Sequence, residues 1–111
     1  MIDNADFIAE LKYTRTEQGG RKNPAQSGYR PHLKFDFTEM LTSGNQFFIG
    51  TDSVYPGEKV IAQIGMGSTY HYEGKLEVGM EFEFCEGSII IGIGKITEII
   101  NQTLEKKKAS T

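Results

Sequence analysis

Two glutamates, Glu81 and Glu83, are the first candidates for catalysis, because a pair of carboxylates can act as general acid and general base. They alternate with Phe82 and Phe84, so both carboxylates fall on the polar side of one strand. Glutamate is usually exposed to solvent, and this alternation is typical of an exposed strand face. The pair therefore does not indicate acid–base chemistry.

Cysteine and histidine offer no better catalytic site. The single cysteine, Cys85, has no neighbouring base in the sequence that would mark it as a nucleophile. The two histidines, His32 and His71, have no Cys or Asp at metal-ligand spacing. A glycine loop of the G-x-x-x-x-G-K-[ST] type is also absent from the sequence. We therefore expect no catalytic residue, no metal, no cofactor and no nucleotide bound by this chain.

Basic residues are the next candidates, because they could contact phosphate groups. Residues 1–34 carry six basic and four acidic residues, whereas residues 35–98 carry three and ten. The excess gathers around a polar loop, Gln18–Ser27, where Arg21 and Lys22 lie, with Arg30 just after it. These side chains either bind a ligand or only solvate the loop, and solvation is the simpler interpretation.

Aromatic residues with polar tips form a second candidate, the cluster Tyr70-His71-Tyr72. Such side chains are common at interfaces and can stack on nucleic-acid bases. They could equally close one end of a barrel. The sequence leaves both alternatives open.

The longest secondary-structure pattern in the sequence is a β-hairpin between Tyr72 and Ile100, and the candidate residues have to be positioned by it and by the strands around it. Its turn is expected at Cys85-Glu86-Gly87-Ser88, with an apolar second arm that begins at Ile89. Gly92 and Gly94 fall on one face and are expected to let the strand bend. The expected core residues of the hairpin are Phe82, Phe84, Ile91, Ile93 and Ile96.

The rest of the 111-residue chain predicts one all-β domain. We expect a flexible N-terminus at residues 1–6, a barrel at 7–101 and a polar, disordered tail at 102–111. Residues Thr38–Asn45 are expected to form a turn region and Tyr55–Glu58 a tight turn. The other expected strands are Phe7–Thr16, Gly28–Phe37, Gln46–Thr51 and Lys59–Met66. In the first of these, one face is expected to carry Phe7, Ala9, Leu11 and Tyr13. In the last, the inward residues are expected to be Val60, Ala62 and Ile64.

Four motifs in this order resemble the third, C-terminal domain of translation elongation factor Tu. They are GGR at residues 19–21, GYRPHLKF at 28–35, V-Y-PGEKV at 54–60 and CEGSIIIGIGKI at 85–96. The resemblance implies a closed six-stranded antiparallel β-barrel, present here without the GTPase domain of that family. In the family this barrel contacts the T-stem of aminoacyl-tRNA, the GTPase domain and the nucleotide-exchange factor.

The resemblance also implies which residues would contact RNA. Glu86 and Gly87 match the family's hairpin turn, whereas His32 replaces a glutamine and Cys85 replaces an arginine. A net charge of −3 also argues against general nucleic-acid binding.

Two functions remain open for a non-enzymatic binding module. The first is binding of a protein partner, and the alternative is binding of a tRNA-like RNA stem. We expect a soluble cytoplasmic protein with no membrane span. The candidate binding residues are Arg21, Lys22, Arg30, His32, Tyr70, His71, Tyr72, Glu86 and Gly87.

Overall fold

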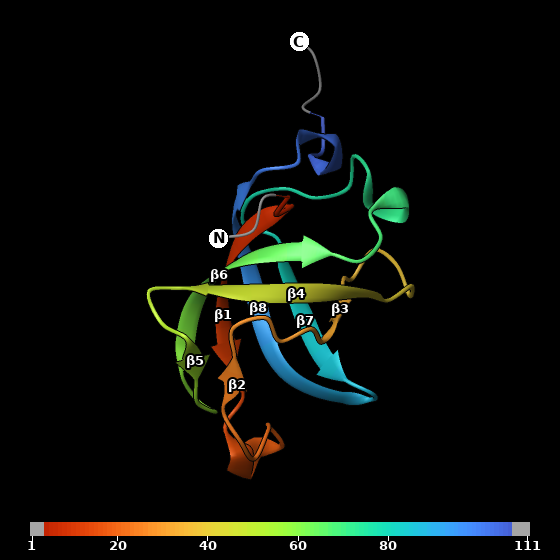
Figure 1. The fold of residues 1–111 in the computed structure, drawn as a ribbon. Coiled ribbons are helices and arrows are strands. Elements are labelled where there is room, and N and C mark those ends of the chain that lie inside the picture. Colours follow the sequence, from red (N-terminus) through yellow and green to blue (C-terminus); the bar gives the residue numbers. More distant parts are fainter. Residues whose placement is uncertain (1–3, 108–111) are drawn as a thin grey trace.

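A computed structural model of the chain describes residues 4–107 (Figure 1). Six antiparallel strands close into a barrel in the order β1-β6-β4-β3-β7-β8, which confirms the expected all-β barrel. Strands β2 and β5 form a separate two-stranded sheet beside it, and three short 3-10 turns complete the described part. The bounds are β1 (Phe7–Tyr13), η1 (Thr16–Gln18), β2 (Ala25–Gln26), β3 (His32–Lys34), β4 (Thr42–Ile49), β5 (Ser53–Val54), β6 (Lys59–Met66), η2 (Tyr70–Tyr72), β7 (Glu81–Glu86), β8 (Ile89–Ile99) and η3 (Gln102–Leu104).

The interior of the barrel is filled by the inward faces of its strands. On β1 and β6 the predicted alternation is confirmed, since each expected inward residue is buried. The rings of Phe82 and Phe84 lie directly over Gly94 and Gly92 of the neighbouring strand β8, where any Cβ would overlap them. The two glycines therefore make room for aromatic rings inside the barrel.

A β-bulge in the hairpin changes which side chains face outward. Cys85 pairs with Ile90 and Phe84 pairs with Gly92, so Ile91 has no partner on β7. As a result Ile91 is buried, while Ile90 and Ile93 are both on the outer face. The prediction that Ile93 belongs to the core is wrong, because strict alternation along β8 stops at this extra residue.

Both ends of the described chain are held more firmly than the sequence predicts. The carboxylate of Asp6 accepts hydrogen bonds from the amide of Met66 and the side chain of Asn101. At the other end, the Leu104 side chain is fully buried and its carbonyl accepts from the amide of Leu76. These contacts fix Asp6 and Leu104 within the segments expected to be flexible or disordered, and residues 1–3 and 108–111 lie outside the described part.

Two strand bounds also differ from the prediction. The expected turn region at residues 38–45 contains the first half of β4, which begins at Thr42. The expected second strand shortens to His32–Lys34, because the segment before it pairs only through a single bridge between Tyr29 and Gln46. No helix among residues 4–107 is long and apolar enough to cross a membrane.

Candidate binding surfaces

Three side chains from separate parts of the sequence meet at the end of the barrel that carries the β7–β8 turn. Arg21, from the loop after η1, forms an ion pair with Glu86 at the end of β7. The Tyr29 hydroxyl donates to the same carboxylate oxygen, and the Arg21 guanidinium lies 4.6 Å from the centre of the Tyr29 ring. The structure thus brings Arg21 and Glu86 together, as partners of each other.

The charges of this cluster are mutually stabilised. The hydrogen bond from Tyr29 is the main cause that lowers the pKa of Glu86; burial opposes it, and the hydrogen bond and charge of Arg21 lower the pKa further. Burial alone would lower the pKa of Arg21, but its contacts with Glu86 and Tyr29 raise it. Burial raises the pKa of Tyr29, as does its bond to Glu86. Arg21 is therefore already engaged within the chain.

The remaining candidates near this end are dispersed. Lys22 is exposed in the loop, and Gly87 begins the two-residue connection between β7 and β8 with a φ of +57°. A positive φ there suits glycine and a tight hairpin turn. His32 is exposed on the outer face of β3, with Ser43 of β4 and Cys85 of β7 as its neighbours in register.

The aromatic cluster on η2 divides into exposed and buried members. The Tyr70 side chain is 75% exposed, and His71 is exposed beside it. Tyr72 is buried against Phe35 and Phe37, and its hydroxyl donates to the carbonyl of Met40 at 3.1 Å. Tyr72 is wrong as a binding candidate, because its ring belongs to the core.

A large hollow lies on the outer face of β3, β7 and β8. It measures about 450 Å³ and is called the hairpin hollow here. Cys85 contributes to its wall and is 5% exposed. The expectation that this residue belongs to the turn is wrong, because it lies within β7. Burial raises the pKa of the Cys85 thiol, and the charge of Glu83 adds to this while Lys34 opposes it. The lining residues are Lys34, Glu39, Leu41, Cys85, Gly87, Ser88 and Ile90.

Large apolar side chains are exposed in and beside the hairpin hollow. Leu41 and Ile90 line it and are 49% and 43% exposed, and Ile93 is 49% exposed further along β8. Ile93 lines a smaller depression together with Asp36, Glu81 and Glu83. This half of the barrel wall therefore combines exposed apolar groups with carboxylates.

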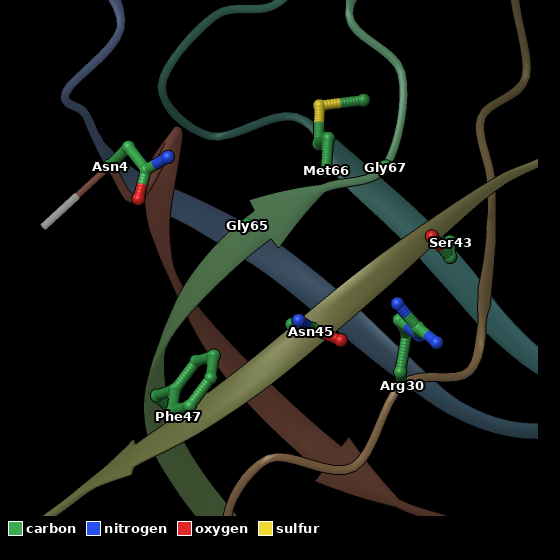
Figure 2. A pocket seen from close by; sticks show the side chains of 8 residues that line it. All are labelled: Asn4, Arg30, Ser43, Asn45, Phe47, Gly65, Met66 and Gly67. Atoms are coloured by element: carbon green, nitrogen blue, oxygen red, sulfur yellow. The ribbon is translucent and has the colours of Figure 1, made fainter. Parts of the chain in front are cut away.

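A second hollow, called the Arg30 hollow here, lies on the outer face of β4 and β6 (Figure 2). It measures about 200 Å³. Arg30 reaches it from the segment before β3, and Figure 2 shows its guanidinium directed toward β4. The lining residues are Asn4, Arg30, Ser43, Asn45, Phe47, Gly65, Met66 and Gly67.

Most residues that line the two hollows were not sequence candidates. Leu41, Ser43 and Asn45 were missed because the sequence pattern predicts a turn at residues 38–45, which hides the alternation along the first half of β4. The signal was present, since Ser43, Asn45 and Phe47 are two positions apart. Among residues 4–107, no group of three or more His, Cys, Asp and Glu side chains could hold a metal ion. No protein-family model matches the chain.

Proposed function

We propose that this chain is a non-enzymatic binding module, and that its hairpin hollow receives an apolar side chain from a protein partner. The observation that carries the proposal is that Leu41 and Ile90, each more than two-fifths exposed, line one hollow, while Ile93 is similarly exposed in a separate, smaller depression further along β8. Contiguous exposed apolar side chains with a polar rim are typical of protein interaction sites. The resemblance to a domain that packs against other protein domains agrees with this proposal.

The charges around the hollow indicate what kind of partner surface fits. This wall carries more negative than positive side chains. The carboxylates that line its two depressions are those of Asp36, Glu39, Glu81 and Glu83. The positive side chains on the same strands are Lys34 and Lys95. An excess of negative charge around an apolar site favours a segment whose apolar side chain is flanked by lysine or arginine. We therefore commit to a basic, apolar protein segment as the partner.

The same charges make RNA the weaker alternative. A phosphate backbone on this wall would face the carboxylates, and electrostatic repulsion would oppose its binding. Arg21, which the sequence offers together with Lys22 as a phosphate contact, is engaged by Glu86. A tRNA-like stem stays a proposal that the experiment below includes as a separate titration.

The proposal is tested with a peptide array. Ten-residue peptides carry a central leucine or phenylalanine flanked either by lysines or by glutamates. We expect the wild-type chain to bind the lysine-flanked set, and the Leu41→Ser/Ile90→Ser double variant to lose affinity about a hundredfold, as central apolar contacts of an interface do. Ile61→Ser, which removes an exposed apolar side chain outside the hollow, is the matched control and should bind as the wild type does.

Two results would overturn the proposal. One is equal binding of lysine-flanked and glutamate-flanked peptides, and the other is unchanged affinity in the double variant. Titration of total tRNA at low salt completes the design, because low salt favours any phosphate-driven binding. Tight tRNA binding together with no peptide binding would replace the protein partner by RNA.

A further inference from the structure

The Arg30 hollow exists because two outward positions of β6 and its extension have no side chain. Asn45 of β4 pairs with Gly65, and the amide of Gly67 donates to the carbonyl of Ser43 at 2.8 Å. A Cβ on Gly67 would overlap the Ser43 hydroxyl. Side chains of ordinary size at these positions would fill the space that the two glycines leave open.

Arg30 is the only charged residue that lines this hollow. In the part of the chain that the structure describes, its guanidinium has neither a hydrogen-bond partner nor a carboxylate within ion-pair distance, in contrast to Arg21. The Asp6 carboxylate bonds the amide of Met66 at the edge of the hollow, and its other oxygen accepts from Asn101. Among the described lining residues, the hollow therefore carries one positive charge that has no carboxylate within ion-pair distance.

The other lining groups are neutral and suit a ligand with a polar edge and a flat face. Asn4, Ser43 and Asn45 provide amide and hydroxyl groups that can donate and accept hydrogen bonds. Phe47 provides an aromatic ring on the same outer face of β4. From Ser43 to Phe47 the strand spans roughly 14 Å, at about 3.4 Å per residue, which is long enough for a phosphate and a base.

The sequence motifs led us to expect no bound nucleotide, but the lining of this hollow favours one: we propose that the Arg30 hollow binds a nucleoside monophosphate, with Arg30 on the phosphate and Phe47 against the base. Guanidinium groups bind phosphate through charge-assisted hydrogen bonds, and an aromatic side chain stacks on any base. The asparagines then contact the polar edge of the base. This site is separate from the hairpin hollow and does not depend on a protein partner.

The test is a titration of the isotope-labelled full chain followed by amide NMR. The probes are adenosine 5′-monophosphate, adenosine alone and inorganic phosphate. We expect the monophosphate to bind more tightly than either part, with shifts at Asn45, Gly65 and Phe47. Arg30→Ala should weaken its affinity by about tenfold to a hundredfold, the effect of losing hydrogen bonds from a charged donor.

Two further variants separate the site from a general charge effect. Gly65→Thr should block binding while Arg30 stays in place, and Gly65 does not have the positive φ that would make the substitution strained. Lys75→Ala, which removes an exposed positive charge outside the hollow, should leave the affinity unchanged. N-acetylphenylalanine is included as a further probe, because a protein carboxylate beside an aromatic ring could occupy the hollow in the same way as a phosphate beside a base.

The outcomes decide the proposal directly. It is overturned if no probe shifts the amides around the hollow, if inorganic phosphate or adenosine binds as well as the monophosphate, or if Arg30→Ala binds normally. Tighter binding of N-acetylphenylalanine would also overturn it, by assigning the hollow to a protein carboxylate.

Discussion

The hairpin hollow and the Arg30 hollow lie on different halves of one barrel wall and differ in how they form. On β8 a single extra residue, Ile91, rotates the strand so that Ile90 and Ile93 both face outward beside carboxylates. On β4 and β6 the alternation is undisturbed, and missing side chains at Gly65 and Gly67 leave a polar depression instead. The inside of a small closed barrel is filled by its core, so its outward positions are free to differ.

The largest expected effect concerns the bulge itself. Ile91→Ala should lower the free energy of unfolding by about 2–4 kcal/mol, because Ile91 is buried in the core. Ile93→Ala, two positions along the same strand, should change it by less than about 0.5 kcal/mol because the side chain is on the surface. Urea denaturation followed by circular dichroism measures both. Equal losses would contradict the assignment of Ile93 to the outer wall.

The charge of the hairpin wall gives a smaller effect. Glu39→Lys should weaken binding of a lysine-flanked peptide about tenfold at low salt, because attraction is replaced by repulsion. The loss should shrink as salt is added, since exposed charges are screened. Fluorescence anisotropy at two salt concentrations tests this, with Glu17→Lys on η1 as the control. A loss that is the same at both concentrations would exclude an electrostatic cause.

The ion pair between Arg21 and Glu86 gives the smallest expected effect. Removing the charge with Glu86→Gln should cost about 0.5–1 kcal/mol of stability near pH 7, a modest value because Glu86 is 44% exposed. The pKa of Glu86 is lowered in the folded chain, so this contribution exists above the unfolded pKa and is lost as the pH falls through the folded one.

Denaturation of wild type and Glu86→Gln between pH 7 and pH 3 measures that dependence. The two curves should converge at the acidic end, and Glu17→Gln should follow the wild type throughout. If the two unfolding free energies differed by the same amount at every pH, Glu86 would act through its shape and not through its charge. Arg21 would then be as available to an external ligand as Arg30.

The sequence predicted the barrel well because the inward positions repeat regularly. Phe7, Leu11 and Ile64 follow a strict alternation that can be read without knowing their neighbours. The outer wall was harder, since the place of Ile93 depends on a bulge whose register is set between two strands. The pairing of Arg21 with Glu86 joins residues 65 positions apart, which no local pattern indicates.

The two hollows were likewise beyond local patterns. Arg30 was a sequence candidate, but the glycines that open a space beside it belong to β6 and its extension. Leu41 was assigned to a turn, and only the closed barrel brings it beside Ile90. The alternation of inward and outward residues therefore indicated the all-β barrel, whereas the binding surfaces required the tertiary arrangement.

The central claim is that a protein segment occupies the hairpin hollow, and the chain carries its own reporter there. Cys85 is the only cysteine and lies in the wall of that hollow. The direct measurement is the rate at which iodoacetamide alkylates Cys85 at pH 8.5, with and without a saturating lysine-flanked peptide, followed by mass spectrometry. We expect the peptide to slow alkylation at least about tenfold, because it closes access to a thiol that is already mostly buried. An unchanged rate at saturation would contradict the claim.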